Sequence, residues 1–194
     1  LPVSLSGTGA AFIAMPGHKG LYGPQGTGLL LCGAAGEPLL LGGTGSNSLD
    51  QSMPDFLPDR HEAGTHNVCG IGGLLAGLRF VRERRPEELL AVERALTALA
   101  ARGLRQLPGV EVFTGPGQCG VLSFRCRDLD CEEAAARLAE AGIAVRAGLH
   151  CAPMAHRSGG TLETGTVRVS FSAFNTSAEV RQFLQVCRTA FLPG

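Results

Sequence analysis

The stretch "PGHKGLYGPQGTG" (16–28) contains five glycines and two prolines and lies between two short apolar runs. Because glycine and proline interrupt regular structure, the runs at 10–15 and 28–33 are predicted to be short buried strands flanking a tight loop. This loop contains Lys19, the only lysine of the chain. A lysine amine attacks a carbonyl only when it is unprotonated, and a desolvated loop at a strand end favours that form. The local pattern is compatible with a Schiff-base lysine and with an ordinary surface lysine.

The composition argues against several classes of partner. The 194-residue chain has no formal net charge and no long basic run, which argues against nucleic acid and anionic membrane surfaces. No apolar run is long enough to span a bilayer, and the first residues do not form a signal-peptide pattern. The seven cysteines are irregularly spaced and include no Cys-x-x-Cys pair. This pattern indicates free thiols in a reducing, cytoplasmic compartment rather than disulfides or a metal site.

The first half of the chain is predicted to continue with one more strand and two helices. The apolar run at 38–43 has the composition of a third buried strand. Between 67 and 80, apolar residues recur at helical spacing: Ile71, Leu74, Leu75 and Leu78. A second helix begins at Pro86 and runs to about Arg102, where Gly103 is expected to stop it.

The second half is predicted to form a small α/β sandwich from about residue 107. Strands are expected at 110–114, 119–126, 143–147 and 166–172. A helix at 130–142 has Asp130 as its cap with Glu133 three residues on, and a last helix at 175–191 has its cap at Thr176 or Ser177. The chain is thus expected to divide into parts at 1–85, 86–106 and 107–194, with the first part forming an edge of something larger.

Three further positions have residue types suited to chemistry. Cys151, in "RAGLHCAP", follows a predicted strand and has His150 and Arg146 nearby, so it is either a reactive nucleophile or an inert buried thiol. Arg168 lies within a predicted strand and needs an anionic partner, which is either a protein carboxylate or a substrate carboxylate. Thr65 precedes a predicted helix and is either a phosphate contact or an ordinary helix cap.

The order and spacing of four motifs resemble the class V aminotransferase family of fold-type I pyridoxal phosphate enzymes, and most closely its cysteine desulfurase and selenocysteine lyase branch. The motifs are "GHKGLYGPQGTG", "EAGTHNVCGIGGL", "GIAVRAGLHCAP" and "VRVSFSAFNTSAEV". The resemblance implies an α/β fold in which 1–85 is the C-terminal part of the large cofactor domain. Residues 86–106 would then be a connecting helix, and 107–194 would be the small C-terminal α/β domain.

The resemblance also implies roles for individual residues. Lys19 would form the Schiff base with pyridoxal 5′-phosphate, and Cys151 would take sulfur or selenium from a cysteine-like substrate as a persulfide. The other implied contacts are cofactor binding by His18, Thr65 and Thr44 and substrate binding by Arg168, Arg146 and Asn67. Thr65 would reach the phosphate of the partner subunit in a homodimer, and Thr44 would lie near the dimer face. The persulfide implies a sulfur-acceptor protein, and no metal is implied.

The sequence departs from the family pattern in two ways. Pro16 replaces a phosphate-binding serine that relatives often have three residues before the lysine. The family's phosphate loop, its ring stacked on the pyridine and its aspartate on the pyridine nitrogen also have no match in this sequence. The chain is therefore expected to correspond to the C-terminal half of such an enzyme and to be inactive alone. The alternatives are another class V aminotransferase or pyridoxal phosphate lyase, and a non-catalytic module that dimerises or binds a partner.

Overall fold

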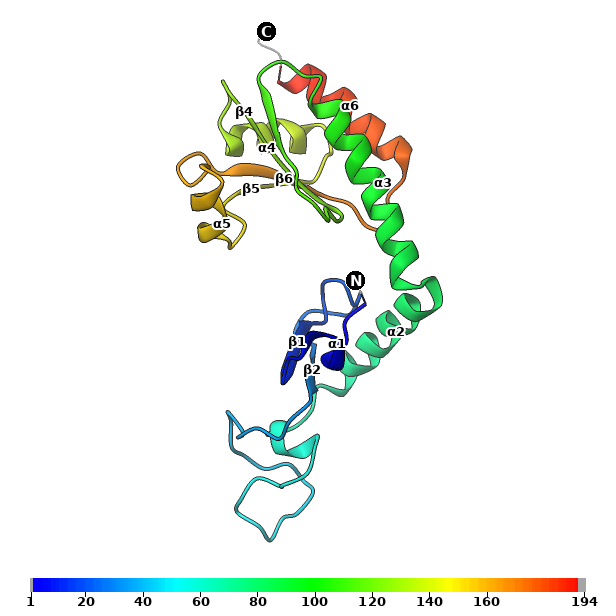
Figure 1. The fold of residues 1–194 in the computed structure, drawn as a ribbon, viewed down its shortest axis with the longest axis vertical. Helices are drawn as coiled ribbons and strands as arrows, with labels where there is room; N and C mark the ends of the chain where they lie inside the picture. The colour runs from blue at the N-terminus through cyan, green and yellow to red at the C-terminus, as the bar shows by residue number, and fades with distance from the viewer. Residues whose placement is uncertain (1, 192–194) are drawn as a thin grey trace. The chain divides into compact units, whose positions relative to one another are not determined.

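The computed structural model describes residues 2–191, and the chain divides into two compact units, Leu1–Pro86 and Glu87–Gly194. Figure 1 shows the elements of each unit. Within 2–191, no helix combines the length and the apolar character that crossing a bilayer requires.

The first unit is built on a β-hairpin and a long helix. Strands β1 (Phe12–Pro16) and β2 (Gly28–Cys32) pair antiparallel, with Pro16 opposite Gly28 at the mouth of the lysine loop. A short helix α1 (Leu5–Thr8) precedes the hairpin, and a 3-10 turn η1 (Asp59–His61) and helix α2 (Val68–Arg84) follow it. Both strands were predicted, but their expected burial was wrong, because Phe12 and Leu30 are 42% and 48% exposed.

The strand predicted at 38–43 was also wrong. This segment lies in the long loop between β2 and η1, and Leu39 and Leu41 are 94% and 77% exposed. A strand requires a neighbour whose backbone it can pair with, and apolar composition does not supply one. The loop instead makes a single backbone bridge to the segment before α2, in which the Gly64 N–H donates to the Gly43 carbonyl at 2.8 Å.

Helix α2 was predicted, but the face that it buries was not. Ile71 and Leu75 are about half exposed, while Gly70, Leu74 and Gly77 are buried. The loop between β1 and β2 (17–27) is called the lysine loop here. A Cβ on Gly77 would overlap the backbone of Leu21 and Tyr22 in this loop, and a Cβ on Gly70 would meet Thr27 at the end of the loop. Helix α2 therefore packs against the lysine loop along a glycine face, which a search for apolar side chains overlooks.

Substitution of Gly77 by Ala should displace the lysine loop and destabilise the first unit by about 1–3 kcal/mol, because the methyl group has no room. Gly72→Ala is the matched control, since Gly72 lies in the same helix and a Cβ there meets nothing within 4 Å. That variant should be stabilised by up to about 1 kcal/mol, because alanine is the better helix former. Thermal unfolding of both variants measures the difference, and equal effects would contradict the packing described.

Helix α3 (Pro86–Leu104) starts at Pro86 as predicted, after a break at Arg85 with a φ of 61°. Gly103 does not stop it, because the helix includes Gly103 and ends at Leu104. The side chain of Leu184 lies where a Cβ on Gly103 would be, so this glycine allows close packing between α3 and a later helix.

The second unit is a four-stranded antiparallel sheet with helices on one face, which is the α/β sandwich predicted. The strand order is β3 (Val110–Phe113), β4 (Val121–Cys126), β6 (Thr166–Ser170) and β5 (Arg146–Gly148). Helices α3, α4 (Cys131–Glu140) and α6 (Ser177–Ala190) supply the other side of the core (Figure 1). The largest of the completely buried core side chains are Phe124, Leu104, Leu122, Leu138 and Val167.

Several element ends differ from their predictions. Strand β5 begins three residues later than expected, and helix α5 (Pro153–Ser158) was not predicted. Asp130 caps α4 through the N–H of Glu132, but Glu133 pairs with Arg137 instead of closing a capping box. The capping box belongs to α6, where Thr176 and Glu179 satisfy each other's backbone N–H groups. These differences depend on local side-chain competition that the spacing alone does not resolve.

Candidate active site

The lysine loop is closed at its base by backbone hydrogen bonds. The Gly17 N–H donates to the Thr27 carbonyl at 2.8 Å, and the Gly23 N–H donates to the Gly17 carbonyl at 2.8 Å. Gly17 is buried, and a Cβ there would overlap Thr27. His18 and Lys19 directly follow this fixed point and are both exposed. The loop therefore holds the lysine backbone firmly while it leaves the amine accessible.

The other candidate residues of the first unit lie in two segments that the Gly43–Gly64 bridge brings together. Thr44 and Thr65 each follow one of these two glycines, so the two threonine segments run side by side at this point. Thr65 is exposed and is not the cap of α2. The cap is Asn67, whose side-chain oxygen accepts from the Gly70 N–H at 3.0 Å.

In the second unit, a row of polar side chains crosses the face of the sheet opposite the core. Leu122, Phe124, Val167 and Val169 point into the core, so the alternating residues Ser123 and Arg168 point the other way. Arg168 lies between Ser123 on β4 and Arg146 on β5 in the strand register. Its Nε is buried and has no hydrogen-bond partner within 2–191. The sheet thus presents a guanidinium whose donors are not all satisfied by the protein.

Cys151 lies in a tight turn just after β5 and is exposed. An Arg146 Nη2 donor is 3.8 Å from the Cys151 sulfur. This contact holds the sulfur beside the cationic side chain at the end of β5. Both Cys151 and His150 have positive φ angles, 61° and 53°. The turn therefore combines an accessible sulfur, a neighbouring cation and a backbone conformation that non-glycine residues rarely adopt.

Two histidine–threonine pairs, one of them within this turn and one next to it, were not predicted. His150 Nε2 is 3.0 Å from Thr166 Oγ1, and His156 Nδ1 is 2.8 Å from Thr161 Oγ1. Burial lowers the pKa of His150, and the nearby charge of Arg168 lowers it further, so the ring is neutral at neutral pH. His150 stood out only as the neighbour of Cys151, because no spacing rule connects it to Thr166.

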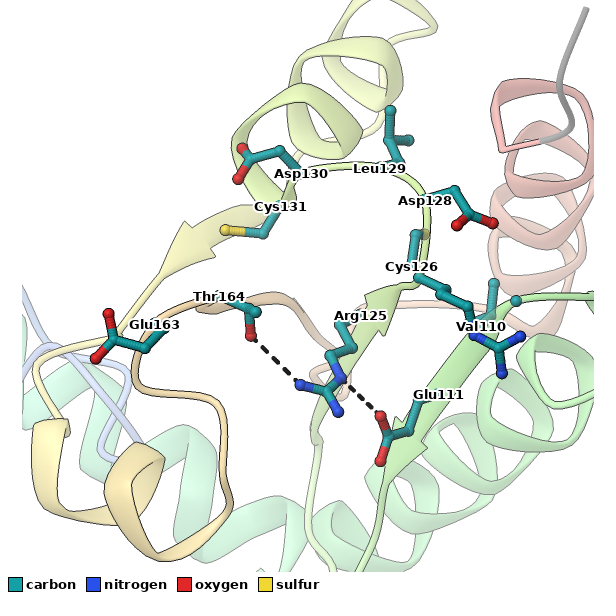
Figure 2. A pocket seen from close by; sticks show the side chains of 12 residues that line it. Val110, Glu111, Arg125, Cys126, Asp128, Leu129, Asp130, Cys131, Glu163 and Thr164 are labelled. Carbon is teal, nitrogen blue, oxygen red and sulfur yellow. Dashed lines mark hydrogen bonds and ion pairs between the residues drawn. The ribbon is translucent and has the colours of Figure 1, made fainter.

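A separate polar cavity of about 610 Å³ lies at the β3–β4 side of the sheet (Figure 2). Arg125 points into it and pairs with Glu111 at 2.6 Å, so its charge is satisfied by the protein. Burial raises the pKa of the Cys126 thiol to about 11, and it also raises the pKa of the Cys131 thiol. These thiols stay protonated at neutral pH and are poor nucleophiles compared with a thiol beside a cation.

The candidate residues form one group in the second unit and two separate sets in the first. In the second unit, the structure brings Cys151, Arg146, Arg168 and His150 to one end of the β5–β6 pair. In the first unit, Lys19 and His18 share the glycine loop, Thr44 and Thr65 follow the two bridged glycines, and Asn67 caps α2. Within 2–191, no group of three His, Cys, Asp or Glu side chains is arranged to hold a metal ion.

Comparison with known protein sequences gives a consistent family. The model of the aminotransferase class-V family matches residues 1–183. A probable cysteine desulfurase of Methanothermobacter thermautotrophicus is 37% identical over 193 residues, which cover 93% of this chain and 48% of that protein. The cysteine desulfurase CsdA of Escherichia coli is 36% identical over 176 residues, covering 87% of this chain and 43% of that enzyme. The chain spans about half the length of the curated relatives it matches.

Solved structures agree with the sequence comparison. The apo cysteine desulfurase of Thermococcus onnurineus matches with a TM-score of 0.87 and 34% identity, over 96% of this chain and 48% of that one. The E. coli CsdA structure with its S-sulfonic acid matches with a TM-score of 0.87 and 32% identity, over 98% and 48% of the two chains. The mixed α/β structure described above therefore matches half of a fold-type I cysteine desulfurase. The chain belongs to the aminotransferase class-V family.

Proposed function

We propose that this chain contributes the sulfur-accepting cysteine, the substrate-binding arginine and the cofactor-binding lysine of a cysteine desulfurase. The observation that supports this most strongly is the Cys151 turn, where an exposed sulfur lies 3.8 Å from the Arg146 guanidinium. An inert structural thiol is buried in apolar surroundings, as Cys187 is, and has no such neighbour. The relatives described above are named cysteine desulfurases, and CsdA was solved with an S-sulfonic acid.

In the proposed reaction, the Cys151 thiolate attacks the sulfur of bound L-cysteine. An S–S bond forms and the substrate C–S bond breaks, with its electron pair staying on carbon. The carbon takes up a proton, so the products are L-alanine and a persulfide on Cys151, and no external oxidant or reductant is needed. Selenocysteine would react in the same way, with selenium in place of sulfur.

Enzymes of this family use pyridoxal phosphate, which supplies an electron sink for charge that develops at the substrate α-carbon. The residues of this chain fit that cofactor and an amino-acid substrate. Gly17, which has no room for a side chain, fixes the backbone next to the accessible Lys19 amine. The unsatisfied Nε of Arg168 is suited to a substrate carboxylate. In this proposal Lys19 binds the cofactor aldehyde, and His18, Thr44 and Thr65 contact its phosphate.

The proposal includes a homodimer and a sulfur-acceptor protein. Thr65 and Thr44 are joined by the Gly43–Gly64 bridge, so one face of the first unit presents both hydroxyl-bearing segments together. In this proposal that face lies against a second subunit and completes its phosphate site.

The persulfide on the exposed Cys151 is accessible to an acceptor thiol, which would remove the outer sulfur by thiol exchange. The chain corresponds in this proposal to the C-terminal half of the enzyme.

The direct test is an assay of the complete enzyme with L-cysteine, pyridoxal phosphate and a reducing thiol. The proposal requires release of sulfide and L-alanine in equal amounts, because each turnover breaks one C–S bond. An enzyme that consumes L-cysteine without forming alanine, or that forms alanine without sulfide, is not a desulfurase.

Arg168→Lys should reduce kcat/KM for L-cysteine about tenfold to a hundredfold, because lysine cannot make the two parallel hydrogen bonds that a guanidinium gives a carboxylate. Most of the loss should appear as a raised KM. Arg125→Lys is the matched control on the neighbouring strand, since Arg125 is paired with Glu111 in the separate cavity. That variant should retain kcat/KM within about twofold. Equal losses in the two variants would argue against substrate binding by Arg168.

A further inference from the structure

We propose that His150 and Thr166 act as positioning residues for Cys151. Their hydrogen bond, called the His150–Thr166 latch below, holds the strained turn in which the cysteine sulfur meets Arg146. The catalytic meaning of this inference rests on the function proposed above. The latch itself can be tested without any turnover.

The turn that presents Cys151 is unfavourable for its sequence. The Ala152 N–H donates to the Leu149 carbonyl at 2.9 Å, so His150 and Cys151 are the two central residues. Positive φ at both central positions is the pattern of a type I′ turn, which strongly favours asparagine and glycine. Histidine and cysteine have Cβ atoms that crowd the backbone in this conformation. Such a turn persists only when surrounding contacts hold it.

The latch supplies such a contact. His150 Nε2 lies 3.0 Å from Thr166 Oγ1, and Thr166 is only 2% exposed. Thr166 is the first residue of β6, which has strand neighbours on both sides and therefore a firmly held backbone. The same strand carries Arg168 two residues further on, with its side chain on the same face as that of Thr166. The latch thus fixes the cysteine turn relative to the strand that carries the proposed substrate-binding arginine.

The second histidine–threonine pair provides an internal comparison. His156 Nδ1 lies 2.8 Å from Thr161 Oγ1, and both residues are buried. The His150 and His156 rings are 5.5 Å apart, so the two pairs share one environment. His156 belongs to α5 and Thr161 to the loop after it, so this pair links α5 to its own following loop. Removing either threonine hydroxyl deletes one histidine–threonine hydrogen bond, but only the His150–Thr166 bond belongs to the cysteine turn.

With the latch intact, the Cys151 sulfur stays 3.8 Å from the Nη2 donor of the Arg146 guanidinium. Without the latch, the turn relaxes toward backbone conformations with negative φ, and the sulfur leaves the guanidinium. The reactivity of Cys151 toward an alkylating agent should therefore report the state of the turn.

The experiment measures the alkylation rate of Cys151 by iodoacetamide in the 194-residue chain, with peptide mass mapping. Exposed Cys69 is the internal reference thiol, and buried Cys131 and Cys187 report unfolding, because they react only in an opened chain. Thr166→Val keeps the β-branched shape while it removes the hydroxyl. This variant should slow alkylation of Cys151, relative to Cys69, about threefold to tenfold, the effect of losing one hydrogen bond.

Three further variants decide the cause. His150→Ala should slow alkylation as Thr166→Val does, because alanine disfavours positive φ and makes no latch. His150→Asn should stay within about twofold of the parent chain, since asparagine tolerates the left-handed conformation without a latch. Thr161→Val should leave the Cys151 rate unchanged. If Thr166→Val opens the chain and exposes Cys187, the comparison of His150→Ala with His150→Asn still tests whether the turn conformation controls the alkylation rate of Cys151.

Wild-type rates in Thr166→Val or His150→Ala would overturn the latch. Equal slowing in Thr161→Val would overturn it as well, because the effect would then be general loosening of the unit. Equal slowing in His150→Asn and His150→Ala would show that the imidazole itself matters and not the turn conformation. None of these outcomes depends on turnover. If the alkylation rates support the latch but the complete enzyme has no desulfurase activity, only the proposed function is rejected.

Discussion

Replacing Lys19 with alanine should abolish turnover of L-cysteine and eliminate covalent attachment of pyridoxal phosphate. Lys19 is the only lysine of the chain, and it lies two residues after the buried, hydrogen-bonded Gly17. Loss of a covalent and proton-transferring amine typically lowers a rate by about a hundredfold to ten-thousandfold or more. Borohydride reduction followed by peptide mapping measures the attachment, and a sulfide assay measures the turnover.

The control for this variant is Gln25→Ala, an exposed position in the same loop. It should retain both attachment and turnover, because it alters the loop surface and not the amine. Attachment that persists at the parent level in the Lys19→Ala enzyme would assign the cofactor to another amine and would remove the basis of the proposed site.

Replacing Cys151 with alanine should abolish sulfur transfer while the bound cofactor keeps its absorbance. The expected fall in sulfide release is at least about a thousandfold, since the nucleophile that accepts the sulfur is absent. Cofactor attachment should be unchanged, because Lys19 and Cys151 belong to different units of the chain.

Cys119→Ala is the matched control in the same unit, because Cys119 is exposed and lies outside the Cys151 turn. It should release sulfide at the parent rate. Undiminished sulfide release by Cys151→Ala would mean that the sulfur leaves by another route, for example as a direct elimination product.

The second unit could be predicted from the sequence because its signals are local and complete. Alternation in β4 and β6 places Leu122 and Val167 inward, and the core that they need is formed within the same unit. The capping residues Asp130 and Thr176 mark the starts of α4 and α6. Each of these helices and strands finds its packing partner nearby, so pattern and structure agree.

The first unit was predicted less well because apolar composition does not say what will cover it. The run that includes Leu39 and Leu41 has the composition of a buried strand but is exposed in a loop. The close packing of α2 depends on Gly70 and Gly77, whose importance lies in the side chain that is missing. Such contacts are set by tertiary approach and leave no periodic signal.

The candidate site likewise contains some residues that could be predicted from the sequence and others that could not. Cys151, Arg146 and Arg168 stood out because a nucleophile and cations near strand ends are chemically conspicuous. The partners that hold the turn did not, because His150 and Thr166 are sixteen residues apart and look like ordinary loop and strand residues. Their connection depends on two consecutive positive φ angles, which His and Cys rarely adopt.

The most direct test of the account is to follow a single turnover of L-cysteine by the complete enzyme with bound pyridoxal phosphate and no reducing thiol. After alkylation, peptide mapping locates any added sulfur atom, and absorbance and chromatography measure pyridoxamine phosphate. We expect one sulfur atom on Cys151, an equal amount of L-alanine, and no accumulation of pyridoxamine phosphate. Accumulation of pyridoxamine phosphate with an unmodified Cys151 would contradict it and would identify the enzyme as an aminotransferase.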